Sequence, residues 1–265
     1  MKVSGDLIVH FAIGALNAIG LVWPWLLAMA VLEWIIPGKR LHFPTWVFNA
    51  VYVPVYLTVA GLVLYPAVQL IAPRLPANLL GLQFEKLGPL GQAAVVVPYL
   101  VLFDFFYYWF HRAQHGWSFM WRYHRFHHAD CNVGVTTATR HHWFEELNRY
   151  FFMSIPLVVL VGHPERVLPW LGVALGIDGM FIHWNTPLRL GWFTGVVVGP
   201  QYHRIHHSFA PSHIDKNFSV LFPFWDRLFG TQCMPVGGEF PATGVTELRH
   251  SNGWRLLLPW PSKSA

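Results

Sequence analysis

Residues 111–128 read H-R-A-Q-H-G-W-S-F-M-W-R-Y-H-R-F-H-H, so five histidines occur in eighteen positions directly after a long apolar run. If the apolar run is helical and its helix continues into this stretch, His111 and His115 lie on one face because they are four residues apart. The same rule holds for His124 and His128. The stretch therefore predicts imidazoles gathered on one side of each helix.

A triplet with the spacing H-x-x-H-H occurs twice in the chain, and positions i, i+3 and i+4 share one helical face. Neutral imidazole is the commonest metal ligand in proteins. The histidines in these motifs are His111, His115, His124, His127, His128, His203, His206 and His207. Eight such ligands exceed the four that one structural zinc ion needs, so two metal ions are the economical number.

The composition is that of a membrane protein. The 265 residues are 54% hydrophobic and only 12% charged, with a mean hydropathy of +0.37, whereas a soluble domain has about 25% charged residues. The net charge of +5 does not indicate nucleic-acid binding, because the basic residues lie beside apolar runs and are explained by lipid head groups. Two cysteines outside any C-x-x-C pair indicate no disulfide framework and fit a reducing compartment.

Apolar runs predict an all-α, multi-pass bundle of about four spans or span equivalents, since about 20 apolar residues cross a bilayer. The runs cover residues 7–36, 46–72 and 89–110, followed by a shorter pair at 150–162 and 167–182 that forms a dipping hairpin or two tilted spans. The run at 7–36 is too long for a signal peptide. We expect a polar helical cap after residue 207 and a short surface helix in the tail.

Apolar runs and histidine motifs alternate along the chain, so we predict a single integral-membrane domain. Its parts are the N-terminal spans (1–88), the histidine-motif region (89–235) and the tail (236–265). Positively charged residues favour the cytoplasmic side of a membrane. Since arginines gather around the motifs, we expect the histidines on that side; these residues are Arg112, Arg122, Arg125, Arg140 and Arg149.

Two carboxylates stand inside apolar runs, where ionisable groups are costly and usually functional or paired. Asp104 shares a helical face with His111 and His115, so we expect it to accept the second ring proton of a metal-bound histidine. The alternative is a carboxylate that reaches the membrane surface. Asp178, five residues before His183, lines a cavity or pairs with a polar neighbour.

The chain resembles the fatty acid hydroxylase/sterol desaturase superfamily of integral-membrane non-haem diiron oxidases. The resemblance extends from about residue 90 onward, and the order and spacing of its segments make it specific. The segments are D-F-F-Y-Y-W-F-H-R-A-Q-H (104–115), H-R-F-H-H (124–128), H-W-N (183–185), H-R-I-H-H (203–207) and N-F-S-V-L-F-P-F-W-D-R-L-F-G-T (217–231).

This resemblance implies that the eight motif histidines bind two irons and that His183 is a further ligand. A family segment R-x-H-P-x-E is matched by Arg140, His142 and Glu145, although Trp143 replaces the proline. His142 is thus a candidate ligand, while Glu145 and Asn185 are candidates for supporting roles. His141 has no counterpart and is expected at the surface or behind the ligands.

The resemblance also implies O₂-dependent hydroxylation or desaturation of an unactivated C–H bond in a lipid. Sterols, fatty acyl or sphingoid chains and carotenoids all remain open as substrates. Electrons are expected from a separate donor (a ferredoxin, a cytochrome b5-like protein or a reductase), because the chain has no dinucleotide fingerprint and no haem motif. The alternative is a histidine-rich membrane protein that binds or transports metal without redox chemistry, which needs ligands spread along the membrane depth.

Overall fold

The computed structural model describes residues 20, 23–40, 42–76, 78–162, 168 and 170–246. Over these residues the chain is helical, and a single pair of residues, Ser208 and Thr243, forms a β-bridge. The predicted all-α class is confirmed for this part of the chain. The start of the first apolar run and the surface helix expected in the tail lie outside the described residues.

Two long helices have the length and apolarity needed to cross a membrane, namely α2 (Phe43–Ile71) and α3 (Pro89–Gly116). Their most apolar windows are only 28% and 17% buried, so these are not core helices of a soluble protein. Large apolar side chains point outward instead, and Leu62 is 57% and Leu90 89% exposed. Such a surface fits a lipid environment.

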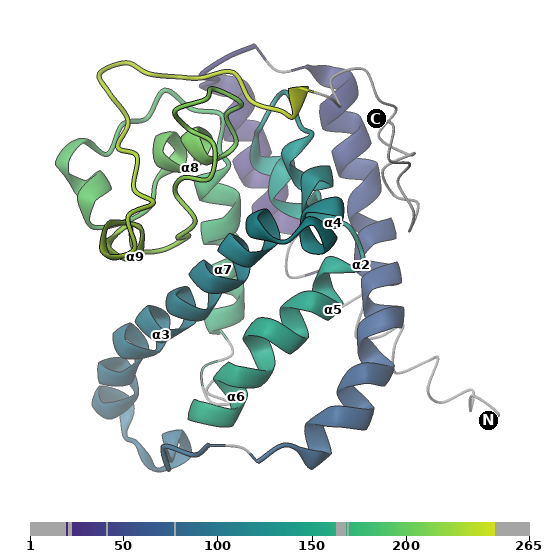
Figure 1. The fold of residues 1–265 in the computed structure, drawn as a ribbon, viewed down its shortest axis with the longest axis vertical. Helices are drawn as coiled ribbons and strands as arrows, with labels where there is room; N and C mark the ends of the chain where they lie inside the picture. Colours follow the sequence, from purple (N-terminus) through teal and green to yellow (C-terminus); the bar gives the residue numbers. More distant parts are fainter. Residues whose placement is uncertain are drawn as a thin grey trace.

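Two other apolar helices are shorter, the helix Trp23–Ile35 and α7 (Trp170–Ile182). The chain descends through α5 (Glu145–Arg149), a π-helical turn (Tyr150–Ser154) and α6 (Ile155–Val161). It then returns through α7 toward the level of α4 (Figure 1). This path matches the predicted hairpin and carries His183 to the end of the bundle where the other histidine motifs lie.

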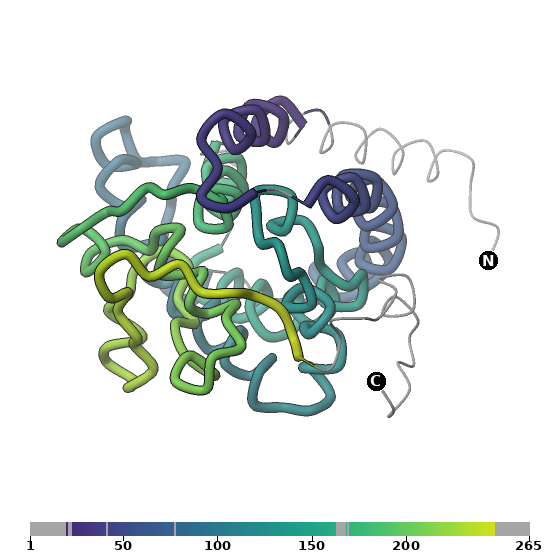
Figure 2. The backbone as a smooth tube through the Cα atoms, turned by 90° about the horizontal axis from the view of Figure 1, so that it is seen from above, coloured from purple at the N-terminus to yellow at the C-terminus, as the bar shows by residue number. Residues whose placement is uncertain are grey.

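The histidine helices lie at one end of the bundle, opposite the 3₁₀ turns Ala72–Arg74 and Phe84–Lys86 that connect α2 to α3 (Figure 1). The helices there are α4 (Ser118–His128), α8 (Pro200–His206) and α9 (Phe224–Leu228), with 3₁₀ helices at Val135–Thr139 and Gly191–Gly195. Seen from above, the segments after α8 fold beside those that contain α4 (Figure 2). Motifs far apart in sequence thus meet at this end.

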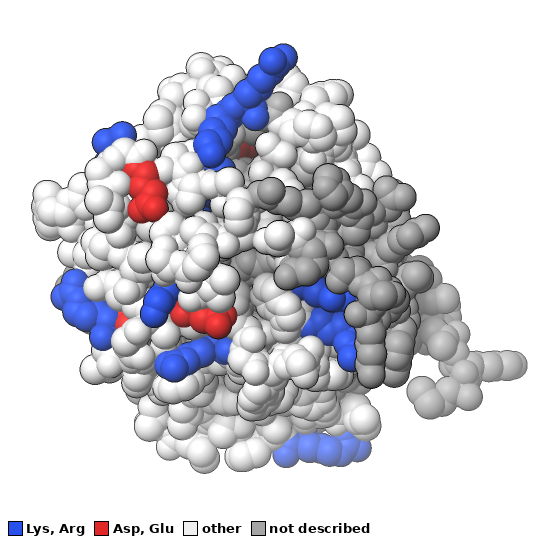
Figure 3. All heavy atoms as spheres, turned by 45° about the horizontal axis from the view of Figure 1, so that its top comes forward, with Lys and Arg blue, Asp and Glu red and all other residues white. Residues whose placement is uncertain are grey.

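Charged side chains are sparse on the face that brings this end forward. In Figure 3 the basic and acidic residues stand singly or in small groups, separated by wide uncharged areas. A protein that binds nucleic acid non-specifically presents a basic patch or stripe to the phosphates. The described part of this face has no such surface.

Candidate metal centre

Nine histidine rings gather in two buried groups, and in each group the potential ligand atoms all lie within 4.8 Å of one another. Group 1 contains His111, His115, His124, His128 and His206. Group 2 contains His127, His183, His203 and His207. The rings come from α3, α4, α8 and the end of α7.

Each H-x-x-H-H motif contributes to both groups. In α4, His124 and His128 belong to group 1 whereas His127 belongs to group 2; the second motif divides in the same manner. The rings of His128 and His207 stack across the boundary, with centroids 4.4 Å apart. The two groups are therefore in direct contact through these rings.

The ring nitrogens are spaced as ligands of a common metal would be. In group 1, His128 Nε2 lies 3.2 Å from His115 Nε2, 3.2 Å from His124 Nε2 and 3.1 Å from His206 Nε2. Metal–imidazole bonds of about 2.0–2.1 Å separate adjacent ligand atoms by about 2.8–3.0 Å in octahedral and about 3.3–3.4 Å in tetrahedral geometry. These distances therefore fit ligands that surround one ion.

Group 2 shows the same spacing. His183 Nε2 lies 3.1 Å from His127 Nε2 and 3.0 Å from His203 Nε2, and His207 Nε2 lies 3.2 Å from His203 Nε2. The Nδ1 atoms of His127 and His183 contact the backbone oxygens of Arg140 (3.3 Å) and Gly179 (2.6 Å). Because a carbonyl oxygen only accepts, each Nδ1 carries the proton and each Nε2 presents a lone pair.

Two facing lone pairs 3.1 Å apart do not form a hydrogen bond, whereas a cation between them would be coordinated by both. The same arrangement recurs in group 1, where His111 and His206 donate through Nδ1 to the carbonyls of Phe218 and Lys216, each at 2.8 Å. Metal-bound histidines typically donate their other N–H in this manner. The donor set therefore fits metal ions.

Burial keeps these imidazoles neutral. It lowers the pKa of His183 to about 4 and lowers the pKa values of His128, His203 and His207 well below the usual value. A neutral ring has a free nitrogen lone pair at physiological pH. The rings are thus available as metal ligands without first losing a proton.

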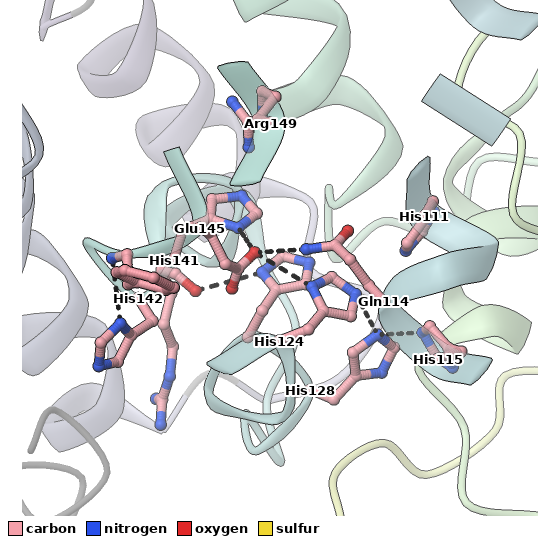
Figure 4. A network of polar contacts seen from close by, with 12 residues as sticks. His111, Gln114, His115, His124, His128, His141, His142, Glu145 and Arg149 are labelled. Carbon is pink, nitrogen blue, oxygen red and sulfur yellow. Dashed lines mark hydrogen bonds and ion pairs between the residues drawn. The ribbon is translucent and has the colours of Figure 1, made fainter. Parts of the chain in front are cut away.

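Glu145 supports group 1 from outside. Its Oε2 atom accepts hydrogen bonds from Gln114 Nε2 (3.0 Å), His124 Nδ1 (3.2 Å) and His141 Nδ1 (3.2 Å) (Figure 4). Burial alone would raise the pKa of Glu145, but the two histidines hold that pKa well below its usual value. The ionised carboxylate fixes the His124 ring with Nε2 toward the group.

Replacing Glu145 with glutamine is therefore expected to weaken metal binding at group 1 by about 10–100-fold, the typical effect of losing an outer partner. Gln keeps the size of the side chain but provides one oxygen acceptor and no charge. Metal titration of the purified protein measures the change. An unaltered affinity would show that Glu145 does not position His124; Glu85→Gln, at an exposed turn, is the matched control.

Of the two adjacent histidines His141 and His142, only His142 departs from its expected place among the ligands. His142 lies in neither group; its Nδ1 accepts a hydrogen bond from the Phe144 amide at 3.1 Å, and its ring packs against Tyr123. Of the two places expected for His141, the structure shows the one behind the ligands, since the ring is buried, stacks on the His127 ring at 4.4 Å and contacts Glu145. The backbone is not regularly helical at this point, so helical spacing gave no information about either ring.

The expected contact between Asp104 and a histidine ring is wrong. The Asp104 carboxylate instead accepts hydrogen bonds from the amides of Val220 (3.0 Å), Leu221 (3.1 Å) and Phe222 (2.8 Å). His111 shares its helical face but is seven residues on, or about 10.5 Å along the axis. Asp104 thus holds the segment whose Phe218 carbonyl accepts from His111.

Asn185 likewise lies away from the histidine groups. Its side chain accepts from the Lys39 amide at 3.0 Å and donates to the Lys39 carbonyl at 2.7 Å. Its own amide donates to Glu33 Oε1, at 2.9 Å. The suggested role of Asn185 at the site is therefore replaced by a structural one, in which it joins the end of α7 to the turn after the helix Trp23–Ile35.

Asp226 was not singled out by the sequence. Its buried carboxylate accepts from the Phe218 amide (2.8 Å), the Ser219 amide (3.0 Å), the Tyr202 hydroxyl (2.9 Å) and the Thr231 hydroxyl (2.7 Å). Its F-W-D-R sequence lies within the segment at 217–231, the last of those that resemble the family. The sequence signal that could have indicated Asp226 is its charge, since the residues around it at 220–229 are mostly apolar.

Two cavities reach the histidines. One of about 350 Å³ is lined by His115, His128 and His206 together with residues that follow α8, such as Asp215. The other, about 280 Å³, borders His141 and His183 and is lined largely by α3 and α7. The groups are therefore approached from two directions.

The chain is similar to lipid-modifying enzymes. The fatty acid hydroxylase family model matches residues 96–231, which are 136 of the 265 residues. An ornithine lipid hydroxylase from Rhizobium tropici is 31% identical over 151 residues, covering 57% of this chain and 45% of that protein. The human (Homo sapiens) alkylglycerol monooxygenase is 33% identical over 131 residues, covering 48% and 28%.

A very-long-chain aldehyde decarbonylase from Arabidopsis thaliana is 27% identical over 143 residues, covering 48% of this chain and 21% of that protein. The match thus covers less than half the length of each of these relatives. No solved structure matches the chain significantly.

Proposed function

Because the chain belongs to the fatty acid hydroxylase family, we propose that it is a membrane-bound diiron oxidase that hydroxylates or desaturates a lipid. It uses O₂ and electrons from a separate donor protein. The matched relatives, whose names identify them as a hydroxylase, a monooxygenase and a decarbonylase, support lipid oxidation.

The observation that carries this proposal is the pair of adjacent histidine groups. Group 1 would hold one iron and group 2 the other, since each offers at least four buried imidazoles with the ring nitrogens facing one another. When bound, the two irons supply the redox chemistry that activates O₂ for reaction with a C–H bond. A metal transporter would need ligands distributed along the membrane depth, and these ligands lie together.

The chain's own residues orient the ligands and admit the substrate. The carbonyls of Phe218, Gly179 and Arg140 and the carboxylate of Glu145 fix the tautomers of the rings. The cavity between α3 and α7 has apolar side chains such as Phe103, Leu175 and Met180 and reaches His183. An acyl or isoprenoid chain in this cavity would exclude water from the site.

We further propose that the histidine groups lie on the cytoplasmic side. Arg122, Arg125 and Arg140 surround the motifs at the ends of the apolar helices, and such residues favour that side. The cavity beside His115 and Asp215 opens among residues of the cap. A soluble electron donor would then approach group 1 from the cap, while the lipid reaches group 2 through the bundle.

Lipid mass spectrometry of a host with and without the gene, grown under ¹⁸O₂, tests this function. We expect a gene-dependent lipid that has gained one labelled oxygen, or one that has lost two hydrogens. The product should disappear in His127→Ala and persist in His42→Ala, an exposed histidine outside both groups. A gene-dependent product that survives His127→Ala would contradict the assigned site.

A further inference from the structure

A carboxylate lines the otherwise largely apolar cavity between α3 and α7. The residue is Asp178, which is half-buried on α7. Phe103 and Tyr107 of α3 and Leu175 of α7 line the same cavity. Charged groups in apolar membrane helices are costly and are kept where they bind, pair or transport. We therefore expect a hydrogen-bond donor or a cation beside the Asp178 carboxylate.

The protein supplies no such partner among the residues that the structure describes, since none of them donates a hydrogen bond to Asp178 or forms an ion pair with it. The cation that lines the cavity, Arg149, pairs with Glu146 through a 3.1 Å contact. The carboxylate whose charge acts on Asp178 is Asp104, which accepts three backbone amides of its own. Asp178 is thus left to accept from a molecule inside the cavity.

Asp178 lies on the path to group 2. Its neighbour Gly179 provides the carbonyl that accepts from His183 Nδ1 at 2.6 Å. His183 is five residues further along α7 and its continuation, which corresponds to about 7.5 Å of helical rise. A lipid that fills this cavity and reaches His183 therefore passes Asp178 several bonds before it reaches the ring nitrogens.

The cavity also has room beside this carboxylate. Gly176 lines it, and a Cβ atom added there would meet no atom within 4 Å. A small side chain at Gly176 is therefore sterically allowed, whereas a large one would occupy the space that a ligand needs. This glycine provides a way to close the cavity without altering Asp178.

We propose that Asp178 accepts a hydrogen bond from the substrate and thereby selects lipids that carry a hydroxyl, amine or amide N–H donor several bonds from the oxidised carbon. The proposal rests on the proposed function for the identity of the ligand as a lipid substrate. It goes beyond that function because it assigns a polar recognition group to a cavity that would otherwise accept any apolar chain.

Binding of two probes to the purified full-length protein under anaerobic conditions tests this assignment. The probes are 1-hexadecanol, which donates a hydrogen bond, and 1-methoxyhexadecane, which only accepts. We expect the wild type, assayed at alkaline pH so that the Asp178 carboxyl is ionised and can only accept, to prefer the alcohol by roughly tenfold, as for a hydrogen bond to a charged group. Asp178→Ala should lose this preference, and Glu85→Gln, at an exposed turn, should keep it.

Gly176→Leu should weaken the binding of both probes equally, because it fills the cavity without removing the acceptor. Equal preference in the wild type and in Asp178→Ala would overturn the assignment. The outcome is separable from the oxidase proposal: a preference that depends on Asp178 without any O₂-dependent product would support the binding site and refute the oxidase. An O₂-dependent product without a preference that depends on Asp178 would support the oxidase and refute the binding site.

Discussion

Replacing His128 with alanine is expected to weaken binding of the iron proposed for group 1 and to lower the rate of lipid oxidation, each by more than 100-fold, although four of the five rings of group 1 remain. The Nε2 atom of His128 lies within 3.2 Å of the Nε2 atoms of His115, His124 and His206. The loss of a direct ligand should exceed the 10–100-fold effect that is typical of losing an outer partner. Iron analysis and product formation by the purified protein measure both effects.

The iron proposed for group 2 serves as an internal control in this experiment. If His128→Ala merely unfolded the protein, iron binding at both groups would be lost, whereas the loss of one ligand should weaken iron binding at group 1 and leave it unchanged at group 2. The same substitution at His42, an exposed residue that contacts Thr45, should change neither iron content nor rate. Full iron and full activity in His128→Ala would remove this residue from the proposed centre.

Asp226→Ala is expected to destabilise the protein by about 3 kcal/mol or more. Its carboxylate is fully buried and accepts from the amides of Phe218 and Ser219 and from the hydroxyls of Tyr202 and Thr231. Each buried donor left without a partner costs about 1–3 kcal/mol. The free energy of unfolding, measured in detergent with a denaturant, should fall accordingly.

Asp226→Asn should be less harmful, because its amide oxygen still accepts from part of this donor set. The exposed substitution Glu85→Gln is the control and should leave the free energy of unfolding unchanged within about 0.5 kcal/mol. Since the Phe218 carbonyl accepts from His111, weaker metal binding at group 1 should accompany the loss of stability. An Asp226→Ala variant as stable as the wild type would show that this segment is held by other contacts.

Helical periodicity predicted much of the architecture. The apolar run before His111 forms α3, which continues to Gly116, and both H-x-x-H-H motifs begin within helices. The histidine spacing therefore indicated correctly which rings would lie near one another. The number of membrane spans is harder to predict from the sequence. Two of the apolar helices, Trp23–Ile35 and Trp170–Ile182, are short.

The division of each motif between two groups could not be predicted from spacing. Adjacent helical residues differ by about 100° in direction, so His127 and His128 point toward different neighbours even though they belong to one face. Which neighbours they meet depends on how α4 packs against α8 and the end of α7. A shared face thus predicts proximity without assigning rings to a particular metal.

The errors arose where position on a face was treated as contact, or where no helix was present. Asp104 is too far along α3 to reach His111 and accepts backbone amides instead. The contacts of His142 and Asn185 involve residues that are irregular or distant in sequence. Partners of this kind are determined by tertiary packing, which local periodicity does not encode.

The central proposal is that the two histidine groups hold two irons. Metal analysis of the purified full-length protein, combined with its optical spectrum, tests it most directly. We expect about two irons per chain and a spectrum that changes on reduction and on exposure to O₂. One or fewer equivalents of zinc, with no iron and no redox-dependent spectrum, would contradict it.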